Sequence, residues 1–166
     1  MNNRARTYIQ NLKIYLDTCC LSRPFNDQTQ IRIRRETDAI EKIFDAFITN
    51  RWLWVVSETL VHEVNNNPNW IERARIKAQI NDAHQNVLIG SIENLRGEQL
   101  EALGFKWFDA LHLACAESSN ADIFLTTDDR LLRRAKRLSS ELRVRVENPY
   151  IWLQGVDRNE CSKNDR

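Results

Sequence analysis

The chain has 166 residues, about the length of one domain, and its charged side chains nearly cancel to a net charge of +1. This total gives no indication of a nucleic-acid partner, and no apolar run reaches the roughly 20 residues of a membrane-spanning helix. The N-terminus lacks the apolar core of a signal peptide, so we expect a cytoplasmic protein that does not contact a membrane. Its four cysteines form no C-x-x-C pair, which argues against structural zinc and for free thiols.

Short apolar runs alternate with helical patterns along the chain. In order, we predict a strand at 13–16, a loop at 19–30, a helix at 31–49, a strand at 52–56, helices at 58–65 and 70–83, a strand at 87–89, helices at 94–103 and 106–119, a strand at 123–126, a helix at 128–138 and an edge strand at 143–146. This alternation indicates an α/β fold, a three-layer α/β/α sandwich around a mostly parallel five-stranded sheet. We place one domain at 13–154 and a frayed polar tail at 155–166.

Several acids occupy comparable places in this pattern. Asp17 ends the first strand, Glu63 lies on the helix after the second, Asp109 opens the helix at 106–119, and Asp128 follows the fourth strand with Asp129 beside it. The carboxyl ends of parallel strands meet at one edge of a sheet, where ligands bind in open α/β folds. We therefore expect these acids to converge.

Converging carboxylates repel one another, and a bound divalent cation relieves that repulsion. Oxygen ligands suit Mg²⁺ or Mn²⁺, and such ions activate water and stabilise a leaving alkoxide at a phosphodiester. Taken singly, each acid also has an ordinary interpretation. Asp17 fits a turn or a helix cap, Glu63 a helix surface, and Asp109 and Asp128 the first turn of a helix, where the helix dipole favours acids.

Four motifs carry a resemblance to a known family. They are an apolar run ending in Asp-Thr at 14–18, a Ser followed six positions later by Glu at 57–63, the segment Phe-Asp-Ala-Leu-His-Leu-Ala at 108–114, and an apolar strand followed by T-x-D at 124–128. In these motifs the chain resembles the PIN-domain family, including the VapC-type toxins, over residues 13–148.

The resemblance implies a five-stranded parallel sheet and a Mg²⁺- or Mn²⁺-dependent endoribonuclease. Many relatives are the toxin of a type II toxin–antitoxin pair and form homodimers, so it also implies an RNA substrate, an antitoxin partner and a homodimer. Carried over by position, Asp17, Glu63, Asp109 and Asp128 are the catalytic, metal-holding acids. Thr126 and, more weakly, Thr18 support them, and Asp129 substitutes for Asp128 or adds to it.

Basic residues gather on two of the predicted helices. Arg32, Arg34 and Arg35 form one cluster, and a second begins at Arg130. The ordinary interpretation is a pair of solvated helix faces. The sharper one is a phosphate-contacting surface, and on it we name Arg32, Arg34, Arg35 and Arg130 as RNA-binding candidates.

Other interpretations remain open. His112, three residues after Asp109, is either a satisfied buried histidine or a residue that faces the acids. A receiver domain or a haloacid-dehalogenase-type phosphatase also places an Asp after the first strand, but neither explains Glu63 and Asp109. A non-catalytic module that binds RNA or a partner protein is the alternative from another class.

Overall fold

A computed structural model describes residues 11–164 of the chain, with side chains as far as residue 159. Its sheet has the strand order β3-β2-β1-β4-β5, and every pair of neighbours is parallel. The strands are β1 (Leu12–Leu16), β2 (Trp52–Ser57), β3 (Gln85–Val87), β4 (Ile123–Leu125) and β5 (Arg145–Glu147). The predicted five-stranded sheet is therefore confirmed, and it is parallel throughout.

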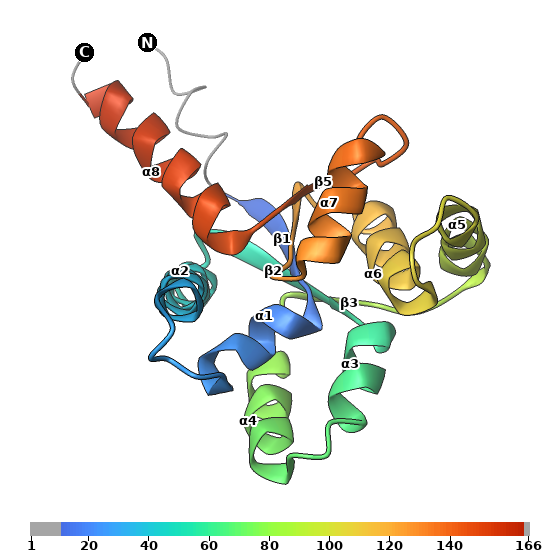
Figure 1. Cartoon of the computed structure of the whole chain (residues 1–166), viewed down its shortest axis with the longest axis horizontal. Coiled ribbons are helices and arrows are strands. Elements are labelled where there is room, and N and C mark those ends of the chain that lie inside the picture. Colours follow the sequence, from blue (N-terminus) through green and yellow to red (C-terminus); the bar gives the residue numbers. More distant parts are fainter. Residues whose placement is uncertain (1–10, 165–166) are drawn as a thin grey trace.

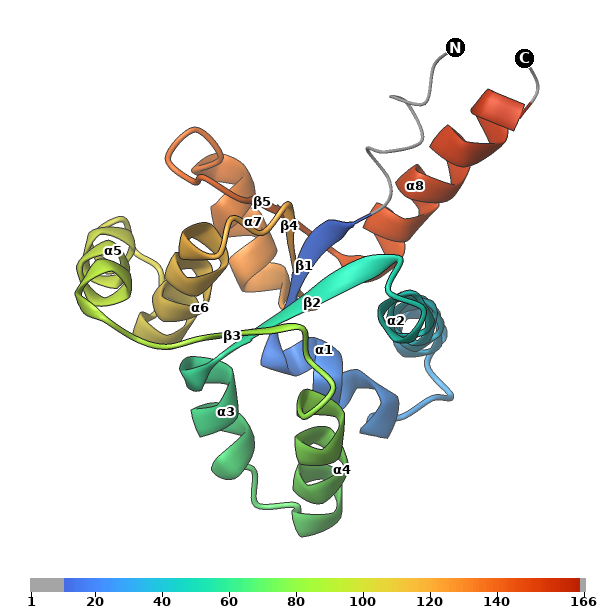
Figure 2. The same ribbon diagram turned by 180° about the vertical axis from the view of Figure 1, so that it is seen from behind.

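Helices cover both faces of this sheet. They are α1 (Thr18–Ser22), the 3₁₀ helix η1 (Arg23–Phe25), α2 (Ile31–Ile48), α3 (Glu58–Asn65), α4 (Trp70–Ile80), α5 (Ser91–Ala102), α6 (Trp107–Ser118), α7 (Asp129–Arg137) and α8 (Pro149–Asn164). Helices α2 and α8 lie on one face, and α5, α6 and α7 lie on the other (Figure 1). The reverse view shows α3 and α4 beyond the end of β2 (Figure 2). The predicted three-layer sandwich is confirmed.

The central strand β1 carries the most deeply buried residues. Ile14, Tyr15 and Leu16 are all fully buried, because β1 lies between β2 and β4 and has helices on both faces. The Tyr15 ring stacks on that of Phe124 in β4, with ring centroids 5.2 Å apart. This packing fixes the end of β1, and with it the position of Asp17.

Several predicted boundaries are wrong, among them that of the helix expected at 94–103, which is α5 and begins at Ser91. The segment 19–30, expected to be a loop, begins with α1 and η1, because the Asp17 carboxylate accepts a hydrogen bond from the Thr18 N–H and caps a helix there. The third strand occupies Gln85–Val87 and not 87–89, since pairing with β2 aligns Gln85 with Val55. Leu88 beyond it is exposed.

Helix α8 runs across residue 154, where we placed the end of the domain, and continues to Asn164. Its first turns are held by packing, because the ring of Trp152 lies 5.0 Å from that of Trp52 and both side chains are buried. The expected frayed tail is therefore helical as far as Asn164, and residues 165–166 lie outside the described part of the chain. Within the described residues, no helix has the length and apolar character of a membrane span.

Candidate active site

Asp17 stands at the carboxyl end of β1 with both carboxylate oxygens occupied. Oδ1 accepts a hydrogen bond from the Thr18 N–H (2.8 Å), and Oδ2 accepts one from the Thr126 hydroxyl (2.7 Å). Thr126 directly follows β4, the neighbour of β1 in the sheet. Asp17 is only 7% exposed. Asp17 can therefore cap α1 and also stand at the carboxyl end of the parallel strands. The two hydrogen bonds hold its carboxylate in one orientation.

Glu63 reaches the same place from α3. That helix starts at Ser57, whose hydroxyl accepts a hydrogen bond from the Leu60 N–H (3.2 Å). Oε2 of Glu63 accepts hydrogen bonds from the Thr18 hydroxyl (2.5 Å) and from Nε2 of His112 (2.6 Å). Thr18 therefore donates to both acids, through its hydroxyl to Glu63 and through its backbone N–H to Asp17.

His112 is buried and still faces the acids, so both interpretations of it hold. Nδ1 lies 2.7 Å from the Tyr15 hydroxyl, which lies 2.6 Å from the hydroxyl of Ser57. With a proton on Nε2 directed at Glu63, Nδ1 accepts from the Tyr15 hydroxyl when the ring is neutral and donates to it when the ring is an imidazolium. A chain of hydrogen bonds therefore connects the cap of α3 through the core to the Glu63 carboxylate.

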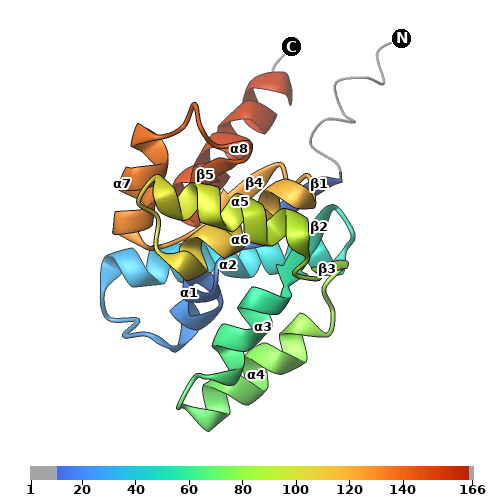
Figure 3. The ribbon, with the colours of Figure 1, turned by 90° about the vertical axis from the view of Figure 1, so that its right-hand side faces the viewer.

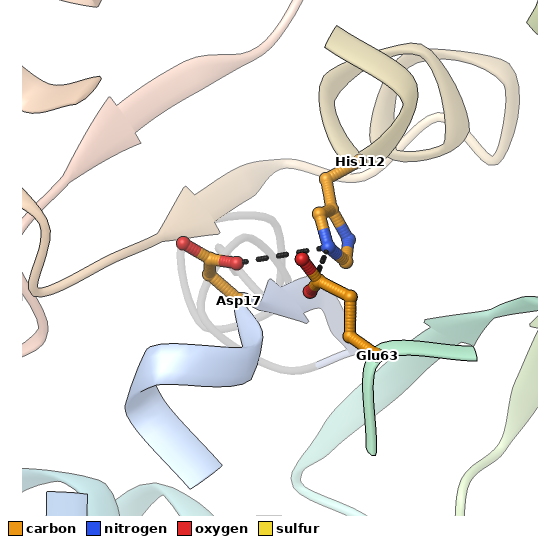
Figure 4. Close-up of side chains that lie close together, drawn as sticks. All are labelled: Asp17, Glu63 and His112. Atoms are coloured by element: carbon orange, nitrogen blue, oxygen red, sulfur yellow. Dashed lines mark hydrogen bonds and ion pairs between the residues drawn. The ribbon is translucent and has the colours of Figure 1, made fainter. Parts of the chain in front are cut away.

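Asp17, Glu63 and His112 form one cluster, in which one potential ligand atom from each lies within 4.8 Å of the others (Figure 4). The three side chains come from the end of β1, from α3 and from α6, and they point toward one another. Two carboxylates form a donor set that suits Mg²⁺ or Mn²⁺. Because Nε2 of His112 is engaged with Glu63, His112 fits the role of orienting that carboxylate.

Charge and burial set the protonation of the Glu63–His112 pair. Burial by itself raises the pKa of Glu63, but hydrogen bonds from His112 and Thr18 outweigh it and leave the pKa lowered. Burial by itself lowers the pKa of His112, but the bond to Glu63 and the charge of Asp17 leave it raised. Both shifts favour a carboxylate facing an imidazolium.

Asp109 and Asp128 flank this cluster. Burial, followed by the negative charges of Asp17 and Asp128, raises the pKa of Asp109 to about 6. Asp128 caps α7, since Oδ1 accepts hydrogen bonds from the backbone N–H groups of Arg130 (2.7 Å) and Leu131 (3.3 Å). The three aspartates are thus electrostatically coupled, which is the repulsion that a cation relieves.

Asp129 takes no part in this cluster. Its carboxylate forms two hydrogen bonds with the Arg32 guanidinium, at 2.7 and 2.8 Å, and these hold the pKa of Asp129 below its ordinary value. Arg32 also contacts Glu36. The guanidinium of Arg35 lies 5.8 Å from the centre of the Tyr150 ring, whereas Arg34 and Arg130 have exposed side chains.

Cys19 is a site residue that the sequence did not reveal. Its Sγ lies 3.2 Å from Oδ2 of Asp17 and 3.2 Å from Oγ1 of Thr126. A cysteine two residues after an acid at the end of a strand carries no recognisable signal, so only the tertiary structure places Cys19 in the site. Cys20 is different, because it is fully buried, its thiol donates to the Leu125 carbonyl, and burial raises its pKa. Burial and the raised pKa of Cys20 both disfavour the thiolate that a cysteine nucleophile needs.

The raised pKa of Asp109 predicts a stability effect in the metal-free protein. The pKa of Asp109 is about 6 in the folded protein, against an ordinary 3.8. Its contribution to the free energy of unfolding is therefore largest below pH 4 and is lost as the pH rises through 6. We expect Asp109→Asn to raise the melting temperature at pH 8 by roughly 2–4 °C, after allowance for solvent screening. Thermal unfolding in EDTA measures this. The gain should vanish near pH 4, and the exposed control Asp38→Asn should show none.

Comparisons with known proteins agree with the fold. A family model described as PIN domain matches residues 14–138. The DNA-bound VapBC structure from Salmonella typhimurium has a TM-score of 0.55 and 15% identity, covering 83% of this chain and 98% of that one. VapBC2 from Rickettsia felis, bound to a promoter DNA fragment, has a TM-score of 0.52 and 12% identity. The match covers 82% of this chain and 98% of that one.

A third structure, VapBC-1 from nontypeable Haemophilus influenzae, has a TM-score of 0.51 and 14% identity, covering 83% of this chain and 98% of that one. At these identities the likeness concerns the fold. No curated protein sequence is significantly similar to the chain.

Proposed function

This chain belongs to the PIN domain family, and from that membership we propose that it is a metal-dependent endoribonuclease and the toxin of a type II toxin–antitoxin system. One observation carries the nuclease part of the proposal. Asp17 and Glu63 are 46 positions apart in the sequence, and their carboxylates approach one another beside His112. Such a cluster at the carboxyl ends of parallel strands supports a cation site for phosphodiester chemistry.

In this proposal Asp17, Glu63, Asp109 and Asp128 hold Mg²⁺ or Mn²⁺. The fit rests on the carboxylate donors and on the raised pKa of Asp109. When bound, a divalent ion supplies Lewis-acid polarisation of the phosphate and a lowered pKa for water. The chain itself orients the acids, since Thr126 fixes one oxygen of Asp17, and Thr18 and His112 fix one oxygen of Glu63.

The RNA would approach over the basic residues near these acids. The candidates for phosphate contact are Arg32, Arg34, Arg35 and Arg130, and all four residues are exposed. An antitoxin partner and a homodimer follow from the resemblance to VapC-type toxins. The free thiols of Cys19, Cys20 and Cys115 suit a reducing compartment such as the cytoplasm.

Cleavage of a labelled RNA with Mn²⁺ and with EDTA tests the nuclease proposal. We expect cleavage with Mn²⁺, 5′-phosphate and 3′-hydroxyl product ends, and no cleavage after chelation, because in-line attack of water expels the 3′-oxygen. Growth arrest on expression, relieved by Asp17→Asn, tests the toxin role. Full activity in EDTA, or a 2′,3′-cyclic phosphate product, would refute the metal-dependent route.

A further inference from the structure

A groove of about 1110 Å³ lies between α2, α7, β5 and α8. This volume exceeds the roughly 300–1,000 Å³ of ordinary small-molecule pockets, so the groove has room for a larger ligand. Asp17, Glu63, Asp109, His112 and Asp128 are all absent from its lining. Figure 3 shows α7 and α8 near β5, which is an edge strand of the sheet. The groove is therefore a surface distinct from the acidic cluster.

The floor of the groove is apolar. Leu132 and Ala135 of α7 line it together with Leu142, Val144 and Val146 around β5. At its margins Ile31 is 59% exposed and Ile151 is 52% exposed. Exposed isoleucines on either side of an apolar floor leave hydrophobic surface that a partner can cover.

The rim of the groove is basic. Six cationic side chains line it: Arg32, Arg35, Arg133, Lys136, Arg143 and Arg145. Its three acids, Glu36, Asp129 and Glu147, are each paired with an arginine of the same rim. The side chains of Lys136 and Arg143 have no acidic partner among the described residues, and both residues are exposed. The groove thus keeps an excess of three positive charges over its acids.

We propose that this groove binds an acidic, amphipathic segment of a partner protein. Carboxylates of the segment meet the rim, and its apolar side chains cover the floor and the two isoleucines. Single-stranded RNA fits less well, because it binds by stacking bases on aromatic faces. The groove offers one aromatic ring, Tyr150, and the Arg35 guanidinium lies over it.

Fluorescence anisotropy on the full chain, without metal or RNA, tests this proposal. The probe is a labelled peptide of alternating Glu and Leu, about ten residues and so roughly 33 Å long when extended. We expect it to bind, to weaken at least about tenfold from low to high salt, and to bind equally to Asp17→Asn. A peptide with Lys in place of Glu should not bind.

Variants locate the binding site. The double variant Arg133→Glu, Lys136→Glu should weaken peptide binding at least about tenfold, and Ile151→Ser should weaken it several-fold. Lys42→Glu, an exposed change on α2 outside the groove, should leave it unchanged. Equal binding by the groove variants, or a labelled single-stranded RNA that binds the groove while the acidic peptide does not, would overturn the proposal. Equal peptide binding by the groove variants does not bear on cleavage at the acidic cluster, whereas RNA binding in the groove would support the RNA path proposed over Arg32 and Arg35.

Discussion

Replacing Asp17 by Asn is expected to reduce Mn²⁺-dependent RNA cleavage on the order of 10²–10³-fold, while the protein remains folded. The carboxylate loses its charge in a cluster whose potential ligand atoms lie within 4.8 Å of one another. Asparagine keeps the shape of the side chain and an oxygen that can accept from Thr18 or Thr126. Initial rates of cleavage at saturating Mn²⁺ measure the loss, and circular dichroism checks the fold.

Asp129→Asn is the matched control for this substitution. Asp129 follows Asp128 directly, but its carboxylate is engaged with Arg32 and not with Asp17 or Glu63. We expect the Asp129→Asn variant to cleave RNA at a rate within a few-fold of that of the native chain. RNA binding that persists in Asp17→Asn, with no cleavage by either the native chain or the variant, would instead favour a non-catalytic binding module.

Glu36→Ala is expected to lower the free energy of unfolding by about 3–5 kcal/mol. Glu36 is 2% exposed, and its carboxylate contacts Nε of Arg23 (2.8 Å), Nε of Arg32 (2.9 Å) and Nδ2 of Asn148 (2.8 Å). It therefore ties η1 and the residue before α8 to α2. Its removal leaves the charge of Arg23, whose side chain is only 17% exposed, without its buried partner.

Urea denaturation followed by tryptophan fluorescence measures this loss, and the melting temperature should fall by roughly 10 °C. Glu41→Ala, an exposed change on the same helix, should cost less than about 0.5 kcal/mol. The loss in Glu36→Gln should lie between those in Glu36→Ala and Glu41→Ala. Its amide oxygen still accepts a hydrogen bond from Asn148, but the charge is gone. A loss in Glu36→Ala no larger than that in Glu41→Ala would show that this network does not stabilise the fold.

Local patterns in the sequence predicted most of the elements. The helix 58–65 was predicted at its observed bounds, and the helices at 31–49 and 106–119 were within one residue at each end. These elements have a clear apolar period, and α3 also has a start signal in Ser57. The helix α8 was missed, because its register depends on the contact of Trp152 with Trp52, a hundred residues earlier in the chain.

The sequence by itself determined the alternation of strands and helices and the position of each acid in that pattern. These depend on neighbouring residues, so periodicity and motif spacing predict them. Only the tertiary structure decided which of the acids meet. It brought Glu63 to Asp17 through Thr18, turned Asp129 toward Arg32, and placed His112 and Cys19 among the acids. Such contacts join residues from different elements, and the direction of a side chain there is set by packing that no local pattern encodes.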